Sequence, residues 1–170
     1  MRQRSRIQTL ALISVLAALT YAATYTIHFP VPGGVFHLGD GVIFLAAVLF
    51  GGPIAGISGA IGMTLFDIFS PWIVYAPYTF VIKGVMGLFT GLVAWSGGRQ
   101  GKDNKWNTLG VAIGGGLMVI GYYLTKAYMV GNFISPIFTA VPYDILQVVG
   151  GALVGLPIAK ALKRTRYFGA

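Results

Sequence analysis

Long apolar stretches alternate along the whole chain with short breaks that are rich in glycine, proline or charge. A helix that crosses a membrane needs about 20 consecutive, mainly apolar residues. Breaks such as Pro30–Gly34 and Ser96–Asn107 divide the chain into six apolar stretches, of which the second is short. The six predicted spans cover residues 7–27, 40–50, 54–69, 78–95, 108–130 and 137–162. We expect the short second span to be recessed, tilted or extended into its flanks.

Composition also indicates a membrane protein. Hydrophobic residues make up 56% of the 170 residues, charged residues make up 9%, and the mean hydropathy is +0.77. Such a chain cannot hide its apolar surface in one soluble core, so lipid must be its solvent. We therefore predict one all-α integral membrane domain over residues 1–170, a six-transmembrane-helix bundle. Its first apolar run is too long for a signal peptide and lacks a clean cleavage site, which indicates an uncleaved first span.

Positive charge is concentrated in three clusters between the spans, which hold ten of the twelve Lys and Arg residues. The clusters are Arg2, Arg4 and Arg6; Arg99, Lys102 and Lys105; and Lys160, Lys163, Arg164 and Arg166. Under the positive-inside rule all three face the cytoplasm, so an even number of spans separates them and both termini are cytoplasmic. The +8 net charge does not indicate nucleic-acid binding, because the cations lie beside aromatic residues at span ends, as membrane anchors do.

Apart from the three cation clusters, five ionisable residues lie within or beside the predicted spans: Asp40, Asp67, Lys83, Lys126 and Asp144. The predicted topology puts all five toward the outer face. A charge at membrane depth costs at least ~2.5 kcal/mol, so each needs a partner or a water-filled cavity. Because aromatic and amide side chains share this level, we predict a ligand pocket that is open to the outside. The candidate ligand-binding residues are Asp67, Tyr75, Tyr78, Lys83, Tyr122, Lys126, Asn132, Tyr143, Asp144 and Gln147.

Simpler interpretations of these charges stay open. Asp67–Lys83 and Lys126–Asp144 could be structural ion pairs, with the tyrosines forming an interfacial belt. Asp40 could be the N-cap of its helix.

The sequence lacks a complete catalytic motif. The G-x-S-G pattern around Ser58 matches that of rhomboid intramembrane proteases, but both histidines lie in the first outer loop and supply no base near the serine. Gly101-Lys102 is not followed by Ser or Thr, which excludes a phosphate-binding P-loop. Without cysteine and without metal-ligand spacing, we expect no enzymatic activity, no cofactor and no metal.

Small residues recur at four-residue spacing in five of the six spans, a pattern that brings helix backbones close together. A stripe that faced away from the bundle would instead contact a separate membrane subunit. Together with the span order and the segments His37–Gly41, Phe50–Gly56 and Lys83–Gly87, these stripes make the whole chain resemble the substrate-binding S component of an energy-coupling factor (ECF) vitamin transporter.

The resemblance implies that a vitamin or vitamin precursor is captured from outside, in the plasma membrane of a bacterium. It also implies a transmembrane coupling (T) subunit and two ABC-type ATPases as partners. In that family the first span contacts the coupling subunit and the first outer loop gates the site. The corresponding residues here are Ser14, Ala18 and Ala22 for the contact, and His28, His37 and Asp40 for the gate.

The branch that the chain resembles transports riboflavin, pyridoxine and hydroxymethyl pyrimidine. A modest pocket with nearly balanced charge favours one ring over three, so we expect hydroxymethyl pyrimidine or pyridoxine, with riboflavin as the alternative. A self-sufficient secondary transporter or channel and a purely structural subunit are the rival classes. A secondary transporter would show repeated halves with broken helices, and the sequence shows neither.

Overall fold

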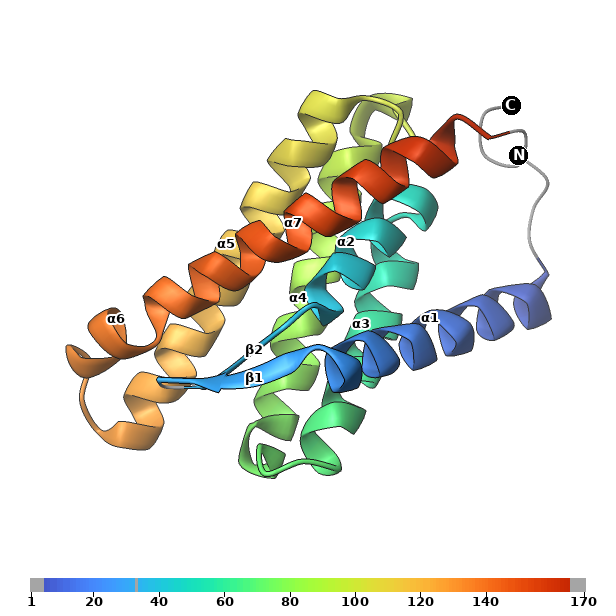
Figure 1. Ribbon diagram of the computed structural model, residues 1–170. Helices are drawn as coiled ribbons and strands as arrows, with labels where there is room; N and C mark the ends of the chain where they lie inside the picture. Colours follow the sequence, from blue (N-terminus) through green and yellow to red (C-terminus); the bar gives the residue numbers. More distant parts are fainter. Residues whose placement is uncertain (1–4, 33, 166–170) are drawn as a thin grey trace.

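The computed structural model describes residues 5–32 and 34–165 and consists of helices with one β-hairpin (Figure 1). Arg2, Arg4 and Arg166 of the cation clusters lie outside the described residues. The elements are α1 (Arg6–Thr26), β1 (His28–Val31), β2 (Gly34–His37), α2 (Gly39–Phe50), α3 (Gly52–Ile68), the 3-10 turn η1 (Ile73–Tyr75), α4 (Ala76–Trp95), the 3-10 turn η2 (Ser96–Gly98), α5 (Asn104–Val130), α6 (Ser135–Thr139) and α7 (Val141–Lys163).

Four of the described helices, α1, α4, α5 and α7, are long and apolar enough to cross a membrane. Helices α2 and α3 are apolar but shorter. At a rise of 1.5 Å per residue, the twelve residues of α2 extend only about 18 Å, less than the ~30 Å hydrocarbon core of a bilayer. The count of six spans therefore stays a prediction.

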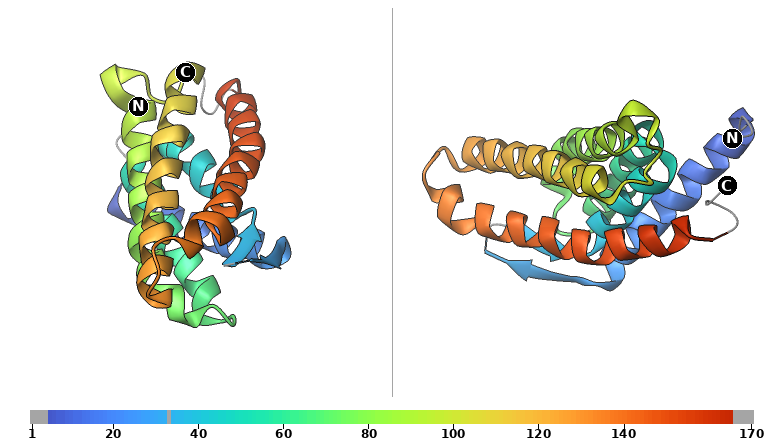
Figure 2. Two further views of the ribbon diagram at one scale, coloured as in Figure 1. Left: turned by 90° about the vertical axis from the view of Figure 1, so that its left-hand side faces the viewer. Right: turned by 90° about the horizontal axis from the view of Figure 1, so that it is seen from above.

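Helix α2 lies at the centre of the bundle (Figure 2). It contacts α1, α3, α4 and α7, and nine of its twelve residues are buried. A helix that is surrounded by protein must be apolar on all sides, which explains why its sequence has no polar face.

Glycine allows the helices around α2 to approach closely. A Cβ added to Gly91 of α4 would collide with the backbone of Gly52 in α3, and one added to Gly155 of α7 would meet the backbone of Gly41 in α2. The small-residue stripes of α3, α4, α5 and α7 are therefore packing positions. The stripe of α1 differs, because Ser14, Ala18 and Ala22 are all exposed.

Hydrogen bonds between connecting segments bring several of them together at one end of the bundle. Trp95 Nε1 donates hydrogen bonds to the carbonyl oxygens of Ala47 and Val48, and Lys163 Nζ donates to the Gln100 carbonyl at 2.6 Å. The α2–α3 turn, the α4–α5 connection and the end of α7 thus lie together, at what we call the inner end. The hairpin, η1 and α6 lie away from it, at the outer end (Figure 1).

The first outer loop departs from the all-α expectation. Strands β1 and β2 pair antiparallel, with His28 opposite His37 and Phe29 opposite Phe36. The rings of Phe29 and Phe36 stack with centroids 4.8 Å apart. Pro30 excludes a regular helix here, but its fixed φ is compatible with an extended strand.

The last predicted span also differs, because a break at Ala140 divides it into α6 and α7. Pro136 and Pro142 lie in the first turns of these two helices, where the missing N–H of proline has no helical partner to lose. Each proline therefore starts a new helix. Pro157 lies within α7 and does not interrupt it.

We expect Gly91→Ala to lower the free energy of unfolding in detergent by about 1–3 kcal/mol, because the new methyl group would force α3 and α4 apart. The melting temperature should fall accordingly. Scanning fluorimetry would measure the change. Gly116→Ala in α5 is the matched control, since no atom lies within 4 Å of its added Cβ. Equal melting temperatures for the two variants would contradict the close α3–α4 contact.

Candidate functional site

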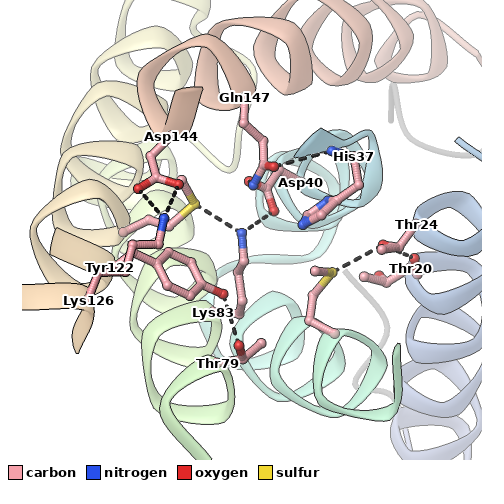
Figure 3. Close-up of polar contacts among 12 residues, drawn as sticks. Thr20, Thr24, His37, Asp40, Thr79, Lys83, Tyr122, Lys126, Asp144 and Gln147 are labelled. Carbon is pink, nitrogen blue, oxygen red and sulfur yellow. Dashed lines mark hydrogen bonds and ion pairs between the residues drawn. The ribbon is translucent and has the colours of Figure 1, made fainter. Parts of the chain in front are cut away.

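A pocket with an empty volume of about 400 Å³ lies at the outer end, between the hairpin and the ends of α3, α4, α5 and α7 (Figure 3). Aromatic, charged and small side chains share its wall. The lining residues are Gly34, Val35, His37, Met63, Asp67, Trp72, Tyr75, Thr79, Tyr122, Lys126, Asp144 and Gln147.

The structure brings most of the candidate ligand-binding residues to this pocket. Those that line it are Asp67, Tyr75, Tyr122, Lys126, Asp144 and Gln147. Lys83 lies beneath it, and Tyr78 packs against the apolar core. Asn132 accepts hydrogen bonds from the backbone N–H groups of Ile134 and Ser135 in the α5–α6 connection. Tyr143 is partly buried and does not line the pocket.

Sequence reasoning missed Thr79 and Met63 as pocket residues. Thr79 precedes Lys83 by four residues on α4, so helical spacing from the buried lysine would have pointed to it. Met63 carries no such signal, because an apolar residue in an apolar helix predicts only packing.

A buried ion pair lies below the pocket. Lys83 Nζ is 2.6 Å from Asp40 Oδ1, and both side chains are fully buried. The other oxygen of Asp40, Oδ2, accepts a hydrogen bond from Gln147 Nε2 at 2.9 Å. Lys83 Nζ also lies 3.0 Å from the sulfur of Met118. The pair and its partners thus join α2, α4, α5 and α7 (Figure 3).

This pair decides two of the interpretations that the sequence left open. Asp40 is not an N-cap: α2 begins at Gly39, its N-cap residue is Leu38, and the Asp40 carboxylate turns to Lys83 in another helix. The alternative of an Asp67–Lys83 ion pair is also wrong, since Lys83 pairs with Asp40. The start of α2 lies deep in the bundle, so its first carboxylate reaches Lys83 where Asp67 does not.

The other ion pair that the sequence left open, Lys126–Asp144, is present in the pocket wall. Lys126 Nζ lies 3.0 and 2.9 Å from the two carboxylate oxygens of Asp144. Lys83 Nζ and Lys126 Nζ are each 5.3 Å from the centroid of the Tyr122 ring, within the range of cation–π attraction. The Tyr122 hydroxyl is hydrogen-bonded to Thr79 Oγ1 at 3.0 Å. These contacts fix the orientation of the central aromatic ring.

Strand β2 covers the pocket on its outer side. The backbone N–H of His37 donates to Gln147 Oε1 at 3.2 Å, and the N–H of Leu38 donates to the carbonyl of Ile27. Burial lowers the pKa of His37 to about 3, so its ring is neutral at ordinary pH. His28 lies on the exposed strand, with Nδ1 2.8 Å from the Tyr25 carbonyl oxygen. Of the three predicted gate residues, His37 lines the pocket, Asp40 lies below it and His28 lies outside it.

Ser58, the residue of the G-x-S-G pattern, is buried within α3. Its hydroxyl donates to the carbonyl of Ile54 at 2.8 Å, one helical turn earlier. The serine therefore has a structural hydrogen bond, and neither His28 nor His37 contacts it in the described structure.

The chain is similar to several known proteins. A family model described as "ECF-type riboflavin transporter, S component" matches residues 4–164. An uncharacterized protein of Pyrococcus woesei is 33% identical over 149 residues, which are 83% of this chain and 92% of the relative. The thiamine precursor transporter HmpT of Lactococcus lactis subsp. cremoris is 27% identical over 164 residues, which are 94% of this chain and 90% of HmpT.

A similar fold is known from a solved structure of the S component of a bacterial ECF transporter. The TM-score is 0.70, and the match covers 93% of this chain and 96% of that one. Sequence identity is only 18%, so the likeness concerns the fold.

We expect Lys83→Met to destabilise the protein by about 3–5 kcal/mol, because it leaves Asp40 buried without its cation. The double variant Lys83→Met/Asp40→Leu should recover much of the loss, since it removes both charges. Thermal unfolding in detergent would measure all three proteins. Asp103→Asn, at a half-exposed pair with an N–O distance of 3.8 Å, is the control and should change stability by less than about 1 kcal/mol. A double variant no more stable than Lys83→Met would contradict the pairing.

Proposed function

Because the chain belongs to the family of ECF-type riboflavin transporter S components, we propose that it binds a small vitamin or vitamin precursor from outside the cell and delivers it as the substrate-capture subunit of an ATP-driven importer. The observation that carries this proposal is the pocket at the outer end, which combines aromatic walls with charged groups beneath a β-hairpin. Such a pocket can bind a ligand but contains nothing that could drive its transport.

For the substrate we propose a single polar ring, hydroxymethyl pyrimidine or pyridoxine. The pocket holds about 400 Å³ of empty space, part of it open solvent, so its modest size favours one ring over three. The similarity to HmpT, a thiamine precursor transporter, supports the pyrimidine. Riboflavin is the second candidate, because the family model carries its name.

The Lys126–Asp144 pair and Tyr122 are the proposed contacts on one side of the ring. The pair is neutral as a whole, which suits an uncharged heterocycle. Lys126 Nζ has three donors and gives only part of them to Asp144, so it can also donate to a ring nitrogen or a phenolic oxygen. Asp144 can accept from a hydroxymethyl group or an amine. The faces of Trp72, Tyr75 and Tyr122 would enclose the ring.

We propose that a T subunit and two ABC-type ATPases supply the energy. The chain itself has no P-loop. The exposed small-residue face of α1 is the proposed contact with the T subunit, because small side chains let a second helix approach closely in lipid. In this arrangement the protein spans the plasma membrane of a bacterial cell six times, with both termini and the inner end in the cytoplasm.

The proposed function predicts that a pyrimidine or pyridine copurifies with the protein in mild detergent. Extraction and mass spectrometry should find it in the wild type and not in Lys126→Ala/Asp144→Ala, whose affinity should fall by about 100-fold or more. The double change removes both charges, so neither is left unpaired. Lys105→Ala, an exposed change at the inner end, should keep the ligand. A copurified isoalloxazine would instead support riboflavin, and a protein that binds none of these compounds would refute the capture role.

The proposed T-subunit contact predicts that assembly can be lost while ligand binding is kept. Ala18→Trp should abolish copurification of the T subunit and the ATPases, because a bulky side chain blocks close helix approach, while the ligand affinity of the isolated chain stays unchanged. Leu153→Trp, on the exposed side of α7, is the control and should assemble normally. Normal assembly of Ala18→Trp would exclude this face of α1.

A further inference from the structure

Two buried polar atoms in the pocket wall have no hydrogen-bond partner. Across the described residues, four buried side-chain atoms are unpaired: His37 Nδ1, Thr64 Oγ1, Asp67 Oδ2 and Asn107 Oδ1. Only His37 and Asp67 among these line the pocket, where their residues are 3% and 4% exposed. An unsatisfied buried polar group is costly and needs an explanation. Because both atoms lie in the wall of the pocket, the missing hydrogen-bond partner points to a bound ligand.

The other buried polar groups of the wall are already engaged. Both ends of the Gln147 amide are hydrogen-bonded, to the His37 N–H and to Asp40. Lys126 contacts both oxygens of Asp144. Asp67 Oδ2 has no hydrogen-bond partner, and the ammonium group of Lys83 is held by Asp40.

We propose that Asp67 and His37 select the ligand, with Asp67 Oδ2 accepting a hydrogen bond from an exocyclic amine and a nitrogen of the His37 ring pairing with a second polar atom of the same ligand. This inference rests on the proposed function and narrows its substrate class to an amino-substituted ring. An ionised carboxylate only accepts hydrogen bonds, so the ligand must donate to it. The neutral His37 ring can donate with one nitrogen and accept with the other.

The three candidate vitamins differ at this position. Hydroxymethyl pyrimidine carries an amine next to a ring nitrogen, an edge that offers a donor to a carboxylate. Pyridoxine offers hydroxyl donors but no amine next to a ring nitrogen. Riboflavin presents an imide whose N–H lies between two carbonyl oxygens, and these oxygens would face the Asp67 carboxylate unfavourably. An unpaired carboxylate together with a His37 ring that can donate therefore matches the adjacent amine and ring nitrogen of the aminopyrimidine.

Calorimetric titration of two probes tests the assignment: hydroxymethyl pyrimidine and its oxo analogue, in which a carbonyl replaces the amine. The wild type should prefer the amine by at least about 100-fold, because the analogue places an acceptor against Asp67. Asp67→Asn should weaken binding of the amine by about 10-fold and bind the analogue more tightly than the wild type does, since the amide N–H₂ can donate to the carbonyl. His37→Phe keeps a planar ring of similar shape and should weaken binding of the amine by about 10-fold.

The controls separate selection from structure. Asp103→Asn makes the same chemical change at the inner end and should leave both affinities unchanged. Equal weakening of both probes by Asp67→Asn, or no preference in the wild type, would overturn the role of Asp67 and leave the capture function intact. Unchanged affinity in His37→Phe would overturn the role of His37. A wild type that binds neither probe but retains a copurified vitamin would reject the aminopyrimidine alone, and one that binds no vitamin would reject the proposed function as well.

Discussion

The buried ion pair between Asp40 and Lys83 is the constraint on which the outer half of the molecule depends. Burying either charge alone at membrane depth would cost much free energy. The helices must therefore be placed so that the Asp40 carboxylate and the Lys83 ammonium group are in contact. Asp40 also lies in the first turn of α2, where the positive end of the helix dipole favours a carboxylate. The pair thereby fixes the depth at which α2 begins and its rotation relative to α4.

The pocket follows from this arrangement. Since α2 begins below the outer ends of its neighbours, space remains above it, and strand β2 covers that space. The hydrogen bonds from Asp40 to Gln147 and from Gln147 to the His37 backbone join the ion pair to the cover. The two buried lysines consequently differ in role. Lys83 stabilises the helices below the pocket through its pair with Asp40, whereas Lys126 lies in the pocket wall beside Asp144.

Much of this could be predicted from sequence, and the failures have physical causes. The apolar stretches predicted the helices, and the shared level of five ionisable residues predicted a polar site at the outer end. The partner of Lys83 could not be predicted, because Asp40 and Asp67 are at the same nominal level and only the position of α2 decides between them. The hairpin depends on pairing between two short segments, and the break at Ala140 depends on which of several prolines begins a helix.

The same limit applies to the small-residue stripes, whose spacing is alike in buried and exposed helices. In α3 and α4 it reflects backbone contacts such as Gly91 against Gly52, whereas in α1 the residues Ser14, Ala18 and Ala22 face outward. The opposite side of α1 is tied to the pocket, because Thr24 Oγ1 donates to the sulfur of Met63 in the pocket wall at 3.1 Å.

The carbonyl of Ile27, just after α1, also accepts from the N–H of Leu38 at the end of the hairpin. One helix thus contacts the pocket wall on one side and exposes a face of small residues on the other. The hydrogen bond between Leu38 and Ile27 joins the end of the hairpin to the residue after α1, and the hydrogen bond between Thr24 and Met63 joins α1 to α3. The proposed ligand site and the proposed subunit contact therefore share one helix, which places them on opposite sides of the same element.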